Sequence, residues 1–384
     1  MKRMGCIGLA LVVFWAVLPF CAQGAEQPDL DVAGKSALLM DIATGKVLYA
    51  QNAHERLAPA SVTKVMTMLL IMEAIDSGKI AMGDTVTTSE TAAAKGGSQV
   101  YLKVGETMTV EDMLKSIAVS SANDCACAMA EHIAGSEAAF VEQMNQRAKE
   151  LGMNDTNYVN CTGLDDGAEA ANHLTSAYDI ALVSRELMAN HPDIQKFTTI
   201  WMDSVRNGEF GLSNTNKLVR FYPGATGLKT GFTSGAGYCL SATAQRDGLG
   251  LIAVVMGCES SQDRFQTCKT MLDYGFANYA LVMPEIGEDI SVDVTLGKKQ
   301  AVTAAPVQTT PLLIDKGQKN MITTQIQLEE AVTAPVSQGQ RLGTMTIRAG
   351  DQVLMQIPLV AEEPVPRLSY GDLFLHVLRK LCMG

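Results

Sequence analysis

The stretch Ala58-Pro59-Ala60-Ser61-Val62-Thr63-Lys64 decides how the rest of this chain is interpreted. A loop of small residues ends at Ser61, and an apolar pattern with helical spacing begins there. Lys64 follows Ser61 by three residues, so a helix places both side chains on one face, with Cβ atoms about 5–6 Å apart. A serine becomes a nucleophile when a base takes its proton, and a lysine can be that base if burial or another cation lowers its pKa. The apolar positions of the helix are Val65, Met68, Leu69 and Met72.

On its own, this tetrapeptide also fits a helix cap followed by a surface lysine. Two further motifs favour chemistry instead. Ser121-x-Asn123 lies in a break between two predicted helices, and Lys229-Thr230-Gly231 lies on a predicted strand. Ser-x-x-Lys, Ser-x-Asn and Lys-Thr-Gly are the motif set of β-lactamases and penicillin-binding proteins. Three matches in suitable structural settings predict a serine acyl-transfer site.

With these motifs the chain resembles the low-molecular-mass penicillin-binding proteins, the serine-type D-alanyl-D-alanine carboxypeptidases that trim peptidoglycan stem peptides. The resemblance extends over nearly the whole chain after its N-terminal segment. Within the group, the sequence is most similar to the carboxypeptidases of Gram-positive spore-forming bacteria. The supporting stretches are Gly105-Glu106-x-x-Thr109-Val110, Asn214-Thr215-Asn216-Lys217, Gly227-Leu228-Lys229-Thr230-Gly231-Phe232-Thr233 and Leu272-Asp273-Tyr274-Gly275-Phe276.

The resemblance implies a catalytic role for four residues. Ser61 attacks the carbonyl of the penultimate D-Ala of the stem and forms an acyl-enzyme, so that the terminal D-Ala is removed. Lys64 takes the serine proton, and the like charge of Lys229 helps to keep Lys64 neutral. Ser121 and Lys229 relay a proton to the leaving amine.

The resemblance also implies five substrate-binding residues. Asn123 hydrogen-bonds the substrate amide. Thr230 binds the substrate backbone and carboxylate, and Gly231 lets that backbone approach closely. Thr233 is expected to supply the second of two N–H groups in an oxyanion hole. Arg264 is the candidate cation that binds the terminal carboxylate. The alternative is that Arg264 forms an ordinary salt bridge at the start of a helix.

Composition bounds the function further. The chain has 384 residues, 47% hydrophobic and 18% charged, which suffices for one large or two ordinary ordered domains. Its formal charge is −11, which argues against nucleic acid as a partner because phosphate binding needs a basic face. No His-Glu-x-x-His zinc motif and no nucleotide-binding glycine loop occurs, so no cofactor and no metal is implied. Seven cysteines follow residue 25, and their disulfide state is left open.

Both ends of the chain have distinctive patterns. Residues 1–25 are predicted to be a signal peptide, with Lys2 and Arg3 at its charged start, an apolar run over 7–18 and small residues at 22–24. This predicts an exported protein at the outer face of the cytoplasmic membrane. Residues 367–384 are predicted to form an amphipathic helix that anchors the chain to the membrane surface, with docking on the protein's own β domain as the alternative. Its apolar stripe consists of Leu373, Phe374, Val377, Leu378 and Leu381.

The hydrophobic periodicity predicts an α+β fold. In residues 26–282, strands at both ends bracket a helical middle, which indicates an antiparallel sheet with a helical subdomain, as in β-lactamase/transpeptidase-like domains. Residues 283–366 alternate as in a small all-β, β-sandwich-like domain. The main predicted elements are strands at 37–40, 46–50, 228–232, 237–245 and 251–257, and helices from 61 to about 77, within 109–133, and at 140–151, 177–190 and 264–280.

Two other functions stay open at this point. An exported class A-like β-lactamase shares the three motifs, but it needs a glutamate that activates the deacylating water. Glu169 is the only superficial candidate in the sequence, and its spacing is wrong. A catalytically silent cell-wall binding protein would have no use for a serine beside two lysines. The expected partners are peptidoglycan stem peptides as substrates and β-lactam antibiotics as covalent inhibitors.

Overall fold

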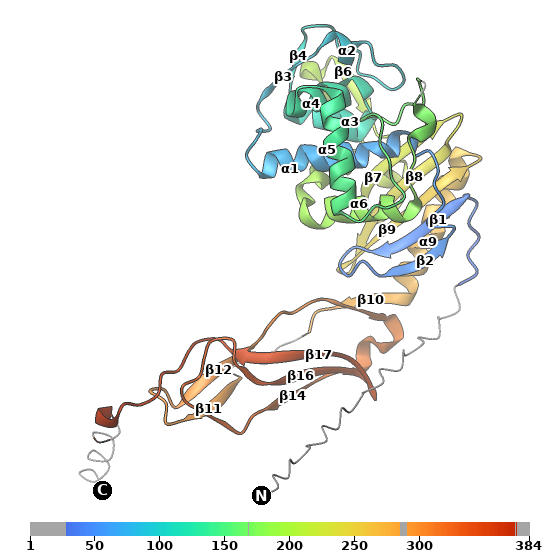
Figure 1. Cartoon of the computed structure of the whole chain (residues 1–384). Coiled ribbons are helices and arrows are strands. Elements are labelled where there is room, and N and C mark those ends of the chain that lie inside the picture. Colours follow the sequence, from blue (N-terminus) through green and yellow to red (C-terminus); the bar gives the residue numbers. More distant parts are fainter. Residues whose placement is uncertain (1–27, 168, 285–289, 373, 375–384) are drawn as a thin grey trace, which may run out of the picture.

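The structure is a computed structural model that describes residues 28–167, 169–284, 290–372 and 374. Figure 1 shows two parts: a larger domain, in which helices pack on an antiparallel sheet, and an elongated domain of strands that follows it. The predicted α+β class and the all-β second domain are both confirmed.

A five-stranded antiparallel sheet forms the base of the larger domain, in the order β2-β1-β9-β8-β7. The N-terminal strand β1 pairs with β9 in the middle of the sheet, for example Leu39 with Ala253, so strands from both ends of the domain join as predicted. The strand β7 lies at the edge and keeps one side free of strand partners. The strands are β1 (Ser36–Asp41), β2 (Val47–Gln51), β7 (Ala225–Thr233), β8 (Gly237–Arg246) and β9 (Leu249–Cys258).

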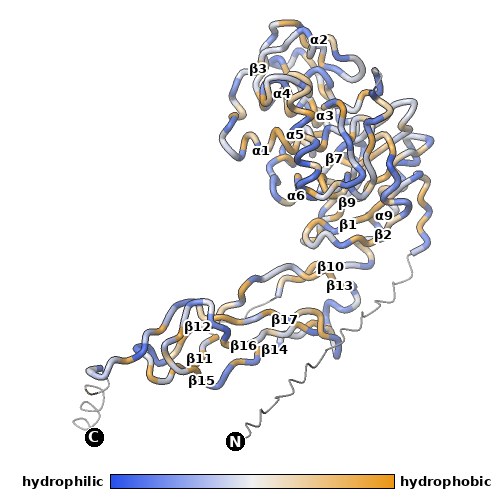
Figure 2. The backbone as a smooth tube through the Cα atoms, viewed as in Figure 1, coloured by the Kyte–Doolittle hydropathy of each residue, from blue (hydrophilic) through white to orange (hydrophobic). Residues whose placement is uncertain are grey.

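Helices cover both faces of this sheet. Leu38 and Met40 of β1 pack with α1 and α6 on one face, whereas Leu39 packs with α9 on the other face. Figure 2 shows that α1 and the central strand β9 are mainly hydrophobic, in agreement with their burial. The helices are α1 (Lys64–Asp76), α2 (Glu90–Ala93), α3 (Val110–Ser120), α4 (Asn123–Ala134), α5 (Glu137–Glu150), α6 (Ala177–Asn190), α7 (Gln195–Thr198), α8 (Leu218–Phe221) and α9 (Ser261–Asn278).

Side-chain caps set where several helices begin. The hydroxyls of Thr109, Ser136, Ser176 and Ser260 each accept a backbone N–H three residues on, which satisfies a donor that the helix itself cannot use. The remaining elements of this domain include two short pairs of antiparallel strands and four 3₁₀ turns. These are β3 (Thr85–Thr87) with β4 (Thr107–Thr109), β5 (Met202–Val205) with β6 (Phe210–Ser213), η1 (Ala60–Thr63), η2 (Ala170–Asn172), η3 (Pro192–Ile194) and η4 (Arg206–Gly208).

The second domain has a core of its own, formed by residues such as Val292, Leu342 and Leu359. Six of its strands form one sheet in the order β14-β16-β17-β12-β11-β15. They are β11 (Ser291–Thr295), β12 (Ala301–Pro306), β14 (Ile322–Leu328), β15 (Ala331–Thr333), β16 (Arg341–Ala349) and β17 (Gln352–Ala361). The strand β13 (Leu312–Asp315) and the 3₁₀ turn η5 (Lys316–Met321) complete the domain.

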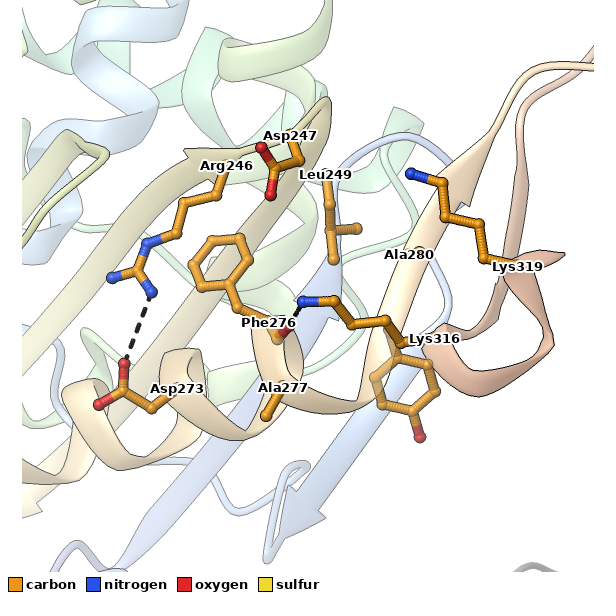
Figure 3. Close-up of a pocket in the computed structure, with 10 residues that line it drawn as sticks. Arg246, Asp247, Leu249, Asp273, Phe276, Ala277, Ala280, Lys316 and Lys319 are labelled. Atoms are coloured by element: carbon orange, nitrogen blue, oxygen red, sulfur yellow. Dashed lines mark hydrogen bonds and ion pairs between the residues drawn. The ribbon is translucent and has the colours of Figure 1, made fainter.

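The two domains meet at the end of α9. The strand β10 (Tyr279–Val282) continues from α9 and pairs with β13 of the second domain. Lys316 Nζ donates to the carbonyl oxygen of Phe276 at 2.9 Å. Figure 3 shows Lys316 directed toward Phe276 at a pocket of about 300 Å³, which Lys319, Arg246 and Asp247 also line. Since α9 covers the sheet face opposite α1, the second domain is attached away from the helical subdomain.

Within the described ranges, no helix combines the length and the apolar character needed to cross a membrane. The backbone is helical at residues 370–372 and at Phe374, where the predicted tail helix begins. The rest of that predicted helix, and the predicted signal peptide, lie outside the described residues.

Candidate active site

The serine and lysine of the first motif are in contact. Ser61 lies in the 3₁₀ turn η1, and Lys64 is the first residue of α1. Lys64 Nζ donates to Ser61 Oγ at 3.0 Å and to the carbonyl oxygen of Thr162 at 2.8 Å. Lys64 is fully buried, and neither η1 nor α1 begins with a side-chain cap. The alternative of a helix cap beside a surface lysine is therefore wrong.

Burial is the main cause of the lowered pKa of Lys64. It lowers the pKa of Lys64 to about 7, against the opposing attraction of the nearby Cys161 and Asp124. Burial first, and then repulsion by Lys64, lowers the pKa of Lys229. Desolvation is thus the main cause of the lowered pKa of Lys64, and the expectation that the like charge of Lys229 helps to keep Lys64 neutral stays a prediction. Close to neutral pH, a large fraction of the Lys64 amine has the free lone pair that a base needs.

The residue before the serine has an unusual backbone conformation. Ala60 has φ +48°, in the left-handed region that residues other than glycine rarely adopt. Its carbonyl oxygen accepts from Thr63 Oγ1 at 2.8 Å. The same carbonyl would lie 1.8 Å from a Cβ atom at Gly163, so only glycine fits there. Strain of this kind persists only where the surroundings hold it, and here it sets the position of Ser61.

A buried histidine supports this arrangement. The backbone N–H of Val159 donates to His173 Nδ1 at 3.1 Å, so the ring proton lies on Nε2. His173 Nε2 lies 2.8 Å from Thr63 Oγ1 and donates to it. Burial, assisted by the charge of Lys64, lowers the pKa of His173 to about 4 and keeps the ring neutral.

The second motif lies at the junction of α3 and α4. Ser121 has φ +64°, ends α3 and is buried. Asn123 is anchored on both sides, since its backbone N–H donates to Ser98 O and its Nδ2 donates to Gly96 O, each at 2.7 Å. Asn123 Oδ1 is buried and has no hydrogen-bond partner within the described part of the chain. Within the described residues, one acceptor of this amide is therefore buried and unsatisfied.

The third motif lies on the edge strand β7. Lys229 is buried, and its Nζ donates to the carbonyl oxygen of Thr230 at 2.9 Å. Burial first, then repulsion by Lys64 and Arg264, lowers the pKa of Lys229. Thr230 Oγ1 donates to Thr215 Oγ1 at 2.7 Å. Among the residues the structure describes, the Ser121 hydroxyl forms no hydrogen bond with either lysine, so the predicted proton relay has no direct link here.

The close approach at Gly231 is not the one we expected. A Cβ atom at this position would lie 2.7 Å from the carbonyl oxygen of Pro59 and 3.0 Å from the nitrogen of Val62. The glycine therefore lets the turn that bears the serine pack against β7. This contact gives a reason for the glycine besides the expected approach of the substrate backbone, which stays a prediction.

Thr233, the expected second donor of the oxyanion hole, lies at the end of β7. Thr233 pairs with Gly237 at the turn that joins β7 and β8, and its hydroxyl accepts from the N–H of Ala236 at 3.1 Å. Successive residues of a strand direct their N–H and C=O groups to opposite sides. Thr233 and the neighbouring Phe232 therefore direct their N–H groups to opposite sides of β7, and one of the two faces its free edge.

Arg264 lies behind β7 and is mostly buried. One guanidinium nitrogen donates to the carbonyl oxygen of Gly231 at 3.0 Å, and the group lies over the ring of Tyr238. It forms no ion pair with any residue that the structure describes, so the alternative of a salt bridge is wrong. The donors of Arg264 support the strand that bears the third motif.

The other acidic groups considered lie outside this site. Glu169 is exposed beside η2 and has no hydrogen bond to the motif residues in the described ranges. Elsewhere, Glu73, Glu186 and His191 bring three possible metal-ligand atoms within 4.8 Å of one another. Arg147 already forms ion pairs with both carboxylates, which explains that cluster without a metal.

Sequence reasoning missed the residues that contribute only their backbone or that support others. Thr162 supplies a carbonyl to Lys64, and Thr215 supplies a hydroxyl to Thr230. Thr215 belongs to the Asn214-Thr215-Asn216-Lys217 stretch that supports the family resemblance, so the sequence pointed to this residue. Nothing in the sequence predicted its hydrogen bond with Thr230.

Comparisons with known proteins agree with this geometry. The D-alanyl-D-alanine carboxypeptidase family matches residues 22–260, and the penicillin-binding protein 5 C-terminal domain matches residues 285–367. D-alanyl-D-alanine carboxypeptidase DacF of Bacillus subtilis is 42% identical over 371 residues, which cover 95% of this chain and 94% of that protein.

Solved structures show the same architecture. Penicillin-binding protein 5 from Haemophilus influenzae matches with a TM-score of 0.75 and 30% identity, covering 90% of this chain and 100% of that one. Penicillin-binding protein D2 from Listeria monocytogenes, solved in an ampicillin-bound form, matches with a TM-score of 0.59 and 30% identity, covering 65% of this chain and 100% of that one. By the family match, the relatives and the shared architecture, the chain belongs to the D-alanyl-D-alanine carboxypeptidase family.

Proposed function

We propose that this protein is a serine D-alanyl-D-alanine carboxypeptidase that removes the terminal D-Ala from peptidoglycan pentapeptide stems. One observation carries the proposal: the buried Lys64 amine, with a pKa of about 7, lies 3.0 Å from Ser61 Oγ. Lys64 takes the Ser61 proton while Oγ bonds to the carbonyl carbon of the penultimate D-Ala. The C–N bond then breaks, the terminal D-Ala leaves with a proton, and water hydrolyses the ester.

The developing oxyanion needs two N–H donors. We assign them to the backbone N–H of Ser61 and of Phe232. The assignment rests on the position of Ser61 in η1 and on the place of Thr233 at the hairpin turn, which favours the neighbouring Phe232 as the residue whose N–H faces the free edge of β7. The contact of Gly231 with Pro59 and Val62 supports it, because that contact fixes the distance between the two segments.

The remaining motif residues bind substrate and move the second proton in this proposal. Asn123 Oδ1, a buried acceptor without a partner in the described chain, takes the N–H of the substrate amide. Thr230 binds the terminal carboxylate, and Ser121 with Lys229 delivers a proton to the leaving amine. The low pKa of Lys229 suits that delivery. Arg264 acts through β7, since it holds Gly231 and lowers the pKa of Lys229.

The same serine is proposed to be acylated by β-lactam antibiotics. The ampicillin-bound state of the Listeria relative supports this for a similar site. A class A-like β-lactamase is less well supported, because Glu169 is exposed and contacts no motif residue among those described. A silent binding protein is less well supported because it has no need of a buried, nearly neutral lysine beside a serine.

The proposal also includes export of the protein and a role for each segment of the chain. Residues 1–25 act as a signal peptide, residues 26–282 as the catalytic domain, residues 283–366 as a spacer domain and residues 367–384 as a membrane-surface helix. The pattern of the N-terminal residues and the apolar stripe at 373–381 support this division. The enzyme would then work at the outer face of the cytoplasmic membrane.

The direct test is release of free D-Ala from a synthetic tripeptide that ends in D-Ala-D-Ala. Wild type is expected to release one D-Ala per peptide, and Ser61→Ala is expected to release none. Hydrolysis of nitrocefin with rapid turnover, without D-Ala release, would favour the β-lactamase alternative. Failure of both reactions with an intact fold would favour the binding protein.

A further inference from the structure

Tyr101 is exposed in a backbone conformation that an aromatic residue rarely adopts. Its φ is +59°, in the left-handed region, and 69% of its surface is accessible. Such a conformation costs on the order of 1–3 kcal/mol and persists only where the surroundings impose it. Burial of the ring does not offset this cost, because the ring is mostly in solvent. The strain therefore points to a function of the exposed ring.

Two buried or paired side chains impose the conformation from both sides. The carboxylate of buried Asp124 accepts the N–H of Val100 at 3.1 Å and the N–H of Leu102 at 3.0 Å. Arg206 donates to the carbonyl of Val100 at 2.8 Å and to that of Tyr101 at 3.3 Å. The backbone on either side of Tyr101 is thus fixed, and its side chain is directed outward.

The hydrogen bonds that fix the backbone around Tyr101 are connected to the catalytic site. Asp124 directly follows Asn123, whose N–H donates to Ser98 O, three residues before Tyr101. Three extended residues span at most about 10–11 Å. In a stem peptide, three residues separate the penultimate D-Ala from the sugar that bears the stem, and they span a similar length. When Asn123 binds the amide near the scissile bond, that sugar comes within reach of Tyr101.

The surface around the ring fits a carbohydrate. Tyr101 lies at an open pocket of about 620 Å³ with Val104, Lys103 and Glu209. Val104 is also exposed. Two cations, Lys103 and Arg206, and two carboxylates, Glu106 and Glu209, line the same pocket, so apolar groups lie beside charges of both signs. An amino sugar has an apolar ring face for the tyrosine and hydroxyl and amide groups for polar partners. A sugar whose lactyl group is bound to the stem is neutral, which suits a rim that has both signs of charge.

We propose that Tyr101 is a stacking platform for the amino sugar to which the stem peptide is attached. The proposal rests on the carboxypeptidase function above and adds a subsite for the glycan part of the substrate. A short peptide reaches the catalytic motifs alone, whereas a stem on its disaccharide also contacts Tyr101.

The experiment compares three substrates that end in D-Ala-D-Ala: a blocked tripeptide, the free pentapeptide stem and the same stem on its disaccharide. Tyr101→Asn removes the ring but tolerates the left-handed backbone, and Tyr101→Phe keeps the ring. We expect Tyr101→Asn to lower kcat/KM about five- to tenfold for the disaccharide substrate only. Tyr101→Phe is expected to stay within about twofold of wild type on all three.

Phe221→Ala is the matched control, because Phe221 is another aromatic residue that is 69% exposed and lies outside this pocket. It is expected to leave all three rates unchanged. A loss with Tyr101→Asn on the free pentapeptide would overturn the sugar assignment in favour of a peptide contact. If Tyr101→Asn lowered kcat/KM equally on all three substrates, or on none of them, the proposal that Tyr101 is a stacking platform would be overturned. If wild type released D-Ala from none of the three substrates, the carboxypeptidase function itself would be contradicted.

Discussion

His173 and Thr63, 110 residues apart in the chain, are joined by a 2.8 Å hydrogen bond beneath the catalytic serine. The bond continues from Thr63 Oγ1 to the carbonyl oxygen of Ala60, the left-handed residue just before Ser61. Because His173 is neutral and its Nδ1 is occupied by a backbone N–H, the direction of donation is fixed. The position of the nucleophile thus depends on a residue that takes no part in the reaction.

The Thr63→Val variant tests this dependence. It keeps the shape of the side chain but removes both hydrogen bonds, which leaves the buried Nε2–H of His173 without an acceptor. We expect a loss of stability of about 1–3 kcal/mol. We also expect benzylpenicillin acylation to slow by about tenfold, since Ala60 can relax. Thr199→Val, which removes an exposed hydroxyl-to-carbonyl bond, should change neither quantity. Normal acylation in a destabilised Thr63→Val protein would show that the network is only structural.

The pH dependence of acylation follows from the lowered pKa of Lys64. The base must be neutral, so its active fraction falls as pH drops below about 7. We expect the second-order acylation constant to rise about tenfold per pH unit below that value and to level off above it. Lys64→Arg remains charged at all accessible pH values and should not be acylated. A rate that keeps rising toward the ordinary lysine pKa would contradict the role of burial.

The contact at Gly231 predicts a sharp difference between two glycines of one hairpin. Gly231→Ala would place a methyl group 2.7 Å from Pro59 O, so η1 must move away from β7. Overpacking of this kind costs about 1–3 kcal/mol, and we expect acylation and D-Ala release to be lost with it. Gly235→Ala meets no atom closer than 3.7 Å and should be tolerated. Retained activity in Gly231→Ala would show that the two segments need not be so close.

Much of this site could be predicted from the sequence because its motifs are local. The three-residue spacing of Ser61 and Lys64 in a helical pattern predicted their contact, and the break before Asn123 was visible in composition. The choice between Thr233 and Phe232 as a donor could not be made from the sequence, because the side to which a backbone N–H points depends on strand pairing, which no local pattern reveals. The contact of Gly231 with the serine turn was missed for a similar reason, since that turn is about 170 residues away in sequence.

Conformational strain was also invisible in the sequence. Ala60, Tyr101 and Ser121 are ordinary residues for a helix or a strand, yet all three have a left-handed backbone. Their conformations are imposed by contacts with residues elsewhere in the chain, such as Gly163 for Ala60 and Arg206 for Tyr101. Propensity describes what a residue prefers, and these positions have a conformation that tertiary contacts hold against that preference.

The predicted amphipathic helix at residues 367–384 leads to a prediction about binding of the protein to a membrane surface. Removal of residues 367–384 deletes the predicted apolar stripe but none of the catalytic motifs. We expect the shortened protein to lose flotation with anionic lipid vesicles and to keep its activity on a soluble tripeptide. A full-length variant that keeps every stripe residue but has Arg379 and Lys380 changed to Gln should still bind neutral vesicles. Full vesicle binding after removal of the tail would contradict the anchor.

The central claim, that Ser61 is a nucleophile activated by Lys64, is tested most directly by intact-protein mass after brief exposure to benzylpenicillin. Wild type is expected to gain the mass of one penicilloyl group and to keep it for minutes or longer, and Ser61→Ala and Lys64→Arg are expected to gain none. An equal adduct on Ser61→Ala, or no adduct on folded wild type, would contradict the account.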